Sequence, residues 1–173
     1  CDLPEAVTCY GWDLMPSTMF EWWSHFAALP MPMPPPRLAI AGCLNLFTDG
    51  SCFRQSQQHL RFAAWAVIIA SPVLDSLQGT HVLESGPLPG LLQSAVRAEL
   101  FAVVRALEFA ITCKVDVTVW SDCNAVVRRM RRVLQGSQIK PSSAHADLWT
   151  RIACLVSNCT NTVKIEKVAA HRK

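Results

Sequence analysis

The sequence predicts an α/β fold, in which a five-stranded mixed sheet is flanked by helices. Three runs with strand-like patterns follow one another where the sheet begins, separated by polar connections. The hydrophobic period then changes to helical spacing, and two further strand patterns each follow a helical one. Because a helix between two strands implies a crossover, part of the sheet is expected to be parallel.

The first three strands are expected to form an antiparallel meander. The runs "CLNLFTDGS" (43–51) and "LRFAAWAVIIAS" (60–71) are strongly apolar, and "CFRQSQQHL" (52–60) between them is typical of a hairpin loop. The run "GTHVLESGPL" (79–88) is more polar, which favours a place near the edge of the sheet.

The later elements follow from a change of period. In "SAVRAELFAVVRALEFAI" (94–111), one face of a helix is traced by apolar residues at 95, 98, 102, 103, 106, 107 and 110. The remaining elements are expected to be a strand at 115–121, helices at 122–134 and 142–158, and a strand at 162–171. Asp122 lies near the start of one helix, and Ser142 or Ser143 can cap the other. The predicted order is βββαβααβ.

Charge and proline content divide the chain into two parts. Residues 1–36 hold four acidic residues and no Lys or Arg, so the remainder holds all 16 basic and 9 acidic residues, a net charge of +7. Seven of the eleven prolines lie in this leader, which ends in the stiff run "LPMPMPPPR" (29–37). We therefore expect an acidic leader and linker at 1–37 and a basic domain at 38–173, whose charge suits a nucleic acid.

Composition also bounds the environment of the protein. The eight cysteines form no C-x-x-C pair and no zinc-like spacing, which favours reduced thiols and an intracellular location. No apolar run approaches the roughly 18 to 20 residues that a membrane-spanning helix needs, so no membrane association is expected. The acidic start lacks the basic leader of a signal peptide, and the absence of an initial Met suggests a fragment of a longer protein.

Three acidic residues fall at positions where they can converge. Asp49 ends the first strand, Asp122 follows the fourth, and Glu99 lies close to the inward stripe of the helix at 94–111. If the first and fourth strands are adjacent, both aspartates emerge at the rim of the sheet where ligands bind in α/β folds. Three carboxylates at one point repel each other, and Mg²⁺ relieves that repulsion through the oxygen ligands that it prefers.

Each of these residues also has a structural alternative. An Asp-Gly pair is a turn signal where a strand ends, which would account for Asp49. Asp122 suits the N-cap of a helix, and Glu99 can form an ion pair with Arg97 or Arg105. The convergence of all three carboxylates on one rim favours a shared metal site.

The ordered blocks "LFTDGSC", "AVRAELFAVVRALEFA", "VTVWSDCNAVV" and "VKIEKVAAH" resemble those of the type 1 ribonuclease H domain. The closest resemblance is to the domain at the C-terminal end of retroelement (non-LTR-like) reverse transcriptases, and it covers about residues 43–173. It implies the ribonuclease H-like fold and an enzyme that hydrolyses the RNA strand of RNA–DNA hybrids. A preceding reverse transcriptase domain in a retroelement polyprotein is also implied.

The resemblance assigns roles to individual residues. Asp49, Glu99 and Asp122 match the family's metal-binding carboxylates, with Gly50 beside them, and Glu99 also touches the 2′-hydroxyl. His171 matches a mobile-loop histidine that assists proton handling and product departure. The implied cofactor is a pair of Mg²⁺ ions, with Mn²⁺ as a substitute, and the products are a 5′-phosphate and a 3′-hydroxyl.

Contacts to the hybrid are expected around this site. An arginine cluster at 128–132 suits a phosphate clamp, although a solvated helix face is the structural alternative, and its four arginines cannot all reach one groove. The predicted nucleic-acid-binding residues are Ser51, Asn124, Arg128, Arg129 and Arg132.

The sequence departs from the family pattern at its end. The family carries a fourth aspartate on a final helix after the histidine, whereas this chain ends at Lys173, so that helix is expected to be missing. A catalytically inactive, nucleic-acid-binding remnant is therefore an alternative function. A second alternative keeps the fold but changes the substrate, as in transposases and Holliday-junction nucleases, but these lack a glutamate at the position of Glu99.

Overall fold

A computed structural model describes residues 43–54, 61–70 and 80–169 of the chain. The expected domain boundary at residue 37 lies outside them. The described elements confirm the order βββαβααβ. They are β1 (Leu44–Phe53), β2 (Phe62–Ala70), β3 (Thr80–Pro87), α3 (Ala95–Cys113), β4 (Val117–Ser121), α4 (Asn124–Leu134), α5 (Ala146–Asn158) and β5 (Val163–Lys167).

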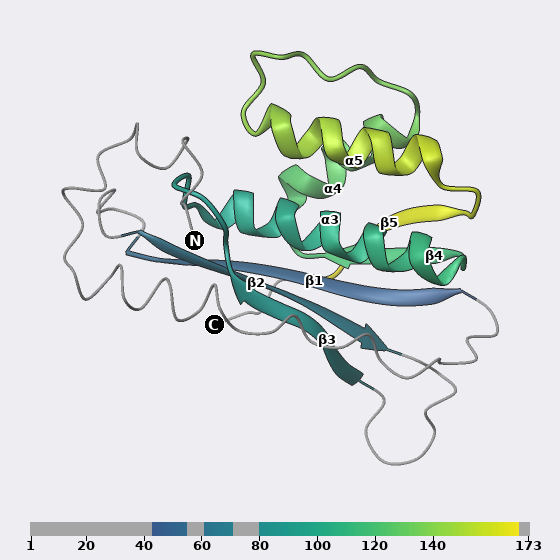
Figure 1. Ribbon diagram of the computed structural model, residues 1–173, viewed down its shortest axis with the longest axis horizontal. Coiled ribbons are helices and arrows are strands. Elements are labelled where there is room, and N and C mark those ends of the chain that lie inside the picture. The colour runs from purple at the N-terminus through teal and green to yellow at the C-terminus, as the bar shows by residue number, and fades with distance from the viewer. Residues whose placement is uncertain (1–42, 55–60, 71–79, 170–173) are drawn as a thin grey trace, which may run out of the picture. The chain divides into compact units, whose positions relative to one another are not determined.

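The strands form one five-stranded mixed sheet in the order β3-β2-β1-β4-β5 (Figure 1). β1 pairs antiparallel with β2, and β2 pairs antiparallel with β3, which confirms the expected meander and the edge position of β3. β1 pairs parallel with β4, and β4 pairs parallel with β5, as the helical crossovers require. The first and fourth strands are therefore neighbours at the centre of the sheet.

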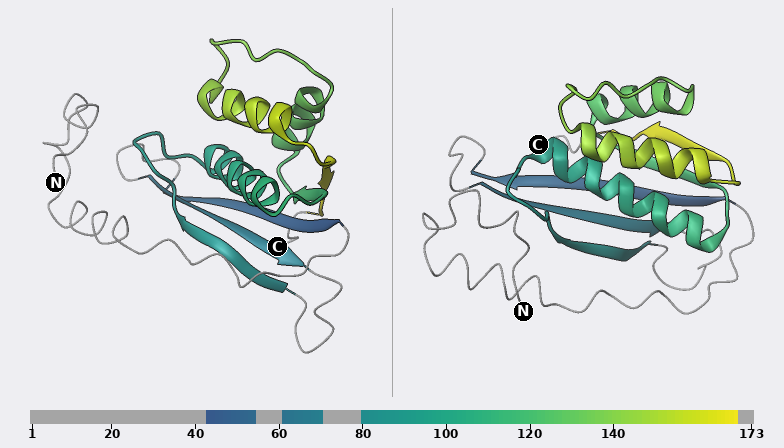
Figure 2. Two further views of the ribbon diagram at one scale, coloured as in Figure 1. Left: turned by 45° about the vertical axis from the view of Figure 1, so that its right-hand side comes forward. Right: turned by 45° about the horizontal axis from the view of Figure 1, so that its top comes forward.

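The three described helices lie over the same face of this sheet (Figures 1 and 2). Alternate strand residues such as Leu46 and Val119 are fully buried beneath them, and Leu107 of α3 packs into the same core. On the opposite face Phe47 and Trp120 are half-buried and stacked, with ring centroids 5.9 Å apart. This period-two burial is the pattern that the apolar strand runs predict.

β1 is longer than predicted, and the expected turn at Asp49 is wrong. Asp49 pairs with Ala66 and the following glycine pairs with Trp65, so the Asp-Gly pair lies inside the β1–β2 ladder. The parallel ladder with β4 ends earlier, at Thr48 and Ser121. Beyond that point β1 continues without β4 beside it, and this projecting part, residues 49–53, carries the first carboxylate.

α3 begins and ends through local hydrogen bonds. Ser94 has an extended backbone (φ −155°), and its hydroxyl accepts a hydrogen bond from the Arg97 N–H at 3.2 Å, as an N-cap does. The helix ends where Lys114 adopts the left-handed conformation at φ 55°. The helix predicted at 94–111 is confirmed and is slightly longer than expected.

The two remaining helices begin later than predicted. Cys123, not Asp122, occupies the N-cap position of α4, and its N–H donates to the Ser121 hydroxyl at 3.1 Å. Because Ser121 serves this turn, the Asp122 carboxylate is left for other contacts, and the structural alternative of an N-cap role for Asp122 is wrong. α5 begins after His145 instead of after Ser142 or Ser143, because backbone bonds such as Ala146 N–H to Ser143 O form a turn there.

Candidate active site

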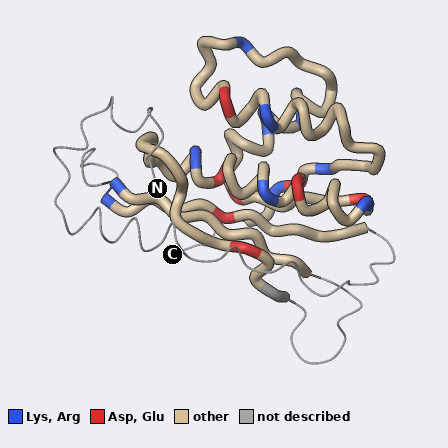
Figure 3. Tube along the Cα trace, in the orientation of Figure 1, with Lys and Arg blue, Asp and Glu red and all other residues tan. Residues whose placement is uncertain are grey.

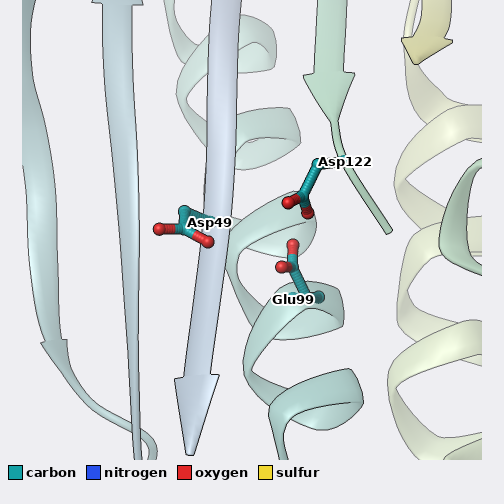
Figure 4. A group of neighbouring side chains, drawn as sticks. All are labelled: Asp49, Glu99 and Asp122. Atoms are coloured by element: carbon teal, nitrogen blue, oxygen red, sulfur yellow. The ribbon is translucent and has the colours of Figure 1, made fainter. Parts of the chain in front are cut away.

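Three carboxylates meet at the edge of β1, just past the end of β4. Asp49 comes from the projecting part of β1, Glu99 from the first turns of α3, and Asp122 from the link between β4 and α4. One carboxylate oxygen of each lies within 4.8 Å of the others. The carboxyl groups of Glu99 and Asp122 point toward each other beside Asp49 (Figure 4). The predicted convergence of these residues is confirmed.

Gly50 allows α3 to approach β1 closely enough for this meeting. A Cβ atom at Gly50 would lie 2.3 Å from the Glu99 nitrogen and 2.7 Å from the Ala98 carbonyl carbon, which is closer than real Cβ atoms come. The main chain of the helix therefore rests directly on the main chain of the strand. Glycine after Asp49 is required by this contact between two backbones, not by a turn.

Glu99 is buried, and the pKa of its carboxyl is strongly raised. Only 5% of its surface is exposed, and burial raises the pKa of its carboxyl to about 8. The nearby Asp122 and Asp49 carboxylates raise this pKa further, while hydrogen bonds from the Gly50 N–H and the Ser121 hydroxyl oppose the rise. The Ser121 contact is 3.4 Å long. The Glu99 carboxyl therefore keeps its proton to a higher pH than an ordinary glutamate, because burial and the neighbouring carboxylates disfavour its charged form.

The structural alternative for Glu99, an ion pair with Arg97 or Arg105, is wrong. Arg97 donates to Asp147 at 3.0 Å, and Arg105 donates to Glu84 at 2.8 and 2.9 Å. Both guanidinium groups therefore balance other carboxylates. Within residues 43–54, 61–70 and 80–169, no basic side chain is paired with Glu99.

The donor set fits a hard divalent cation. It consists of carboxylate oxygens, which are the ligands that Mg²⁺ takes, and one of the carboxylates is buried without a cationic partner among the described residues. A bound cation would offset both the mutual repulsion of the three groups and the burial of Glu99. A cavity of about 350 Å³ also borders the cluster, lined by Phe47, Thr48, Asp49, Ile68, Asp122, Val168 and Ala169.

The predicted nucleic-acid contacts surround the cluster unevenly. Arg129 lies over the Trp149 ring, 4.9 Å from its centroid, and Arg131 pairs with Glu166 at 2.9 Å. These two arginines are held by neighbours within the protein. The other predicted contacts are exposed on β1 and α4: Ser51, Asn124, Arg128 and Arg132.

One feature of the site was not predicted, and one prediction lies outside the described residues. Ser121 links the cluster to α4, since its hydroxyl donates to Glu99 and accepts from the Cys123 N–H. A polar residue at a buried strand end, directly before Asp122, is the sequence signal for it. His171 lies outside the described residues.

The fold and the carboxylate cluster together define a class of protein, the nucleases of ribonuclease H-like architecture. A family model described as RNase H matches residues 42–173. The chain therefore belongs to the RNase H family, and its enzyme class is ribonuclease H. Comparison with curated proteins finds no match.

Solved structures show the same fold. The RNase H domain of PFV is 21% identical, with a TM-score of 0.57 and coverage of 74% of this chain and 79% of that one. LC11-RNase H1 in complex with an RNA/DNA hybrid is 20% identical, with a TM-score of 0.51 and coverage of 73% and 85%. The foamy viral protease-reverse transcriptase in complex with an RNA/DNA hybrid is 14% identical, with a TM-score of 0.58 and coverage of 90% and 24%. The predicted ribonuclease H-like fold is confirmed.

None of the described helices is long and apolar enough to cross a membrane. The described cysteines all have free thiols.

Proposed function

We propose that this chain hydrolyses the RNA strand of RNA–DNA hybrids with divalent metal ions. The observation that carries the proposal is the cluster of Asp49, Glu99 and Asp122, whose oxygens lie within 4.8 Å of one another. Family membership supports the reaction class, and RNA/DNA hybrids are bound by two of the similar structures.

We propose two Mg²⁺ ions, for which Mn²⁺ can substitute, held by the three carboxylates with Gly50 beside them. When bound, the ions supply Lewis-acid activation of water and neutralise charge on the scissile phosphate. The protein orients Glu99 through the Gly50 N–H and the Ser121 hydroxyl, so that its carboxylate can also accept a hydrogen bond from a ribose 2′-hydroxyl. His171 assists proton handling and product departure, and the products carry a 5′-phosphate and a 3′-hydroxyl.

The hybrid is positioned by exposed groups on both sides of the cluster. Ser51 on β1 and Asn124 at the start of α4 flank the carboxylates, and Arg128 and Arg132 present charge for phosphates. Arg129 lies over the Trp149 ring, and this contact restrains its guanidinium before any substrate arrives.

We further propose that the chain is part of a retroelement polyprotein and follows a reverse transcriptase domain. The similarity to foamy viral protease-reverse transcriptases supports this context. The free thiols of the described cysteines favour an intracellular location, where such thiols stay reduced.

Cleavage of an end-labelled RNA–DNA hybrid in Mg²⁺ tests the proposal, with duplex DNA and duplex RNA as comparison substrates. Asp49→Asn should abolish cleavage. Asp116→Asn is a matched control, because Asp116 lies before β4 at the other end of the strand and accepts the Thr162 N–H through an oxygen that asparagine retains.

Equal cleavage by wild type and Asp49→Asn would exclude the carboxylate site. A chain that includes any residues encoded beyond Lys173 is assayed in parallel, because the family carries a fourth aspartate after the histidine. Hybrid binding without cleavage by both chains would favour the inactive nucleic-acid-binding remnant.

A further inference from the structure

Buried polar residues gather at the carboxylate cluster. Among the residues that the structure describes, only three polar or charged residues are buried: Thr48, Glu99 and Ser121. Thr48 and Ser121 form the last pair of the parallel β1–β4 ladder, and each directly precedes an aspartate of the cluster. The acidic positions of β1 and α3 lie close together beside this end of the ladder (Figure 3). Because a buried hydroxyl without a partner is unfavourable, the contacts of these two hydroxyls indicate what each one holds.

The Ser121 hydroxyl is held on both sides by the protein. A serine hydroxyl has one proton to donate and can also accept hydrogen bonds. The Ser121 oxygen accepts the Cys123 N–H at 3.1 Å, and its proton is donated to Oε2 of Glu99 at 3.4 Å. The main chain is fixed as well, because the Ser121 carbonyl accepts the Val168 N–H at 3.2 Å. Ser121 is 0% exposed, so solvent offers this proton no competing partner.

The Thr48 hydroxyl does something different at the same end of the ladder. It donates to the Trp120 carbonyl at 3.2 Å and so ties β1 to β4. Among the described residues, Thr48 has no hydrogen bond to Glu99. The two buried hydroxyls therefore differ in one respect, because only that of Ser121 bonds a carboxylate of the cluster.

The hydrogen bonds to Glu99 limit what it can offer to a cation. With Oε2 bonded to Ser121, the other carboxylate oxygen is the one left free of that bond. The Gly50 N–H also donates to this carboxyl, so it is restrained from β1 as well as from β4. Mg²⁺ requires a near-octahedral set of oxygens, whereas the larger Ca²⁺ takes more oxygens and can bind both oxygens of one carboxylate. A glutamate held in this way suits Mg²⁺ better than Ca²⁺.

We propose that Ser121 is a positioning residue through which the cluster selects Mg²⁺ over Ca²⁺, because its hydroxyl holds Oε2 and leaves Glu99 a single oxygen for a cation. This inference rests on the proposed function. Hydroxyls bond ionised carboxylates at shorter distances than 3.4 Å, so this restraint should tighten when Glu99 ionises to bind a cation. Hydrogen bonds to ligating side chains change metal affinity by about 10- to 100-fold, which is enough to separate two ions.

Calorimetric titration of the whole chain with Mg²⁺ and with Ca²⁺, in the absence of nucleic acid, tests the proposal. The measured quantity is the ratio of the two dissociation constants. Both ions require an ionised carboxylate, so this ratio cancels any change in the Glu99 pKa between variants. In Ser121→Ala the preference for Mg²⁺ should fall about tenfold, because Glu99 can then bind a cation through both oxygens. Ser121→Thr keeps the hydroxyl and should keep the wild-type ratio.

Thr48→Val is the matched control, because it removes a buried hydroxyl directly before Asp49 that does not bond Glu99. Its ratio should equal that of the wild type. In a Glu99→Ala background, Ser121→Ala should leave the ratio unchanged, because the group through which Ser121 acts is absent. Ser121→Cys fills nearly the same space with a weak donor, so it should shift the ratio in the same direction as Ser121→Ala and replaces that variant if it does not fold.

An unchanged ratio in Ser121→Ala and Ser121→Cys would overturn the proposal. Equal changes in Ser121→Ala and Thr48→Val would also overturn it, because the end of the ladder and not the bond to Glu99 would then set the preference. If the wild type binds Mg²⁺ and only the ratio test fails, the proposed function stands without this inference. A wild type that binds neither ion, with or without a hybrid, would overturn both.

Discussion

Gly50 and Glu99 are in direct backbone contact, since a Cβ atom at Gly50 would lie 2.3 Å from the Glu99 nitrogen. The contact joins a strand residue to a helix residue that is far along the chain. It also places the Gly50 N–H where it donates to the Glu99 carboxyl. The position of Glu99 is therefore set by the absence of one methyl group on the neighbouring strand.

Gly50→Ala should destabilise the protein by about 2 kcal/mol or more, because the added methyl meets main-chain atoms that cannot rotate away. Urea unfolding measures the change. Gly86→Ala is the control, since its Cβ would lie 3.9 Å from the Trp65 ring, an ordinary contact. Equal stabilities of the two variants would show that α3 can move off β1 without cost.

The stability of the metal-free protein should depend on pH through Glu99. Its pKa in the folded protein is about 8, above the ordinary value of 4.5, so both states are protonated below pH 4.5. Between pH 4.5 and 8 only the unfolded chain loses the proton, and stability should fall by about 1.4 kcal/mol per pH unit from this group. Denaturation in EDTA at several pH values measures the slope, and Glu99→Gln should remove this contribution. An unchanged slope in that variant would assign the pH dependence to other groups.

Metal binding at neutral pH should release a proton. A carboxylate must be ionised to ligate Mg²⁺, and Glu99 holds its proton up to a pKa of about 8. The affinity for Mg²⁺ should therefore weaken by up to about tenfold for each pH unit below 8. Calorimetric titration in buffers of different ionisation enthalpy counts the protons released. Binding without proton release at pH 7 would mean that Glu99 is not a ligand.

Arg105 should contribute more to stability than an exposed arginine of the same fold. Its guanidinium contacts both Glu84 on β3 and Glu108 on α3, and all three side chains are largely buried. Arg105→Met should cost about 2 kcal/mol, because it leaves the largely buried Glu84 without its cation, while Glu108 keeps Arg151. Arg131→Met breaks a pair in which both side chains are about half exposed, and should cost under about 1 kcal/mol. Thermal unfolding compares the two variants, and equal losses would contradict the argument from burial.

Arg128→Ala should weaken hybrid binding at all sequences and lower the slope of log affinity against log salt by about 1. Arg128 is exposed on α4, and the described residues provide no ion pair for it. Lys164→Ala, on β5, removes an equal charge as a control and should leave the slope unchanged. A salt series of fluorescence anisotropy titrations measures both variants, and equal slopes would remove Arg128 from the interface.

Long periodic segments and the order of elements were predictable from the sequence, because burial on one face imposes a period that local exceptions do not erase. The meeting of Asp49, Glu99 and Asp122 followed from that order. Details set by single tertiary contacts were not predictable. The Asp-Gly pair does not form a turn, because both residues are paired with β2 in the antiparallel ladder. Asp122 does not cap α4, because the Ser121 hydroxyl accepts the Cys123 N–H at the start of that helix. The alternative that Arg97 or Arg105 pairs with Glu99 failed because the partners of these arginines, Asp147 and Glu84, lie on other elements.

The central position of β1 has a consequence for the order of folding. Its antiparallel partner β2 is nearby in sequence, whereas its parallel partner β4 pairs residue 44 with residue 117. Closing so long a loop is entropically slower than forming the meander, so β4 is expected to join a β1–β2 nucleus that already exists. Asp122 arrives with β4. A nascent or partly refolded chain would therefore hold the β1–β2 pair before its carboxylate cluster is complete, and nuclease activity would appear only once β4 has joined the sheet.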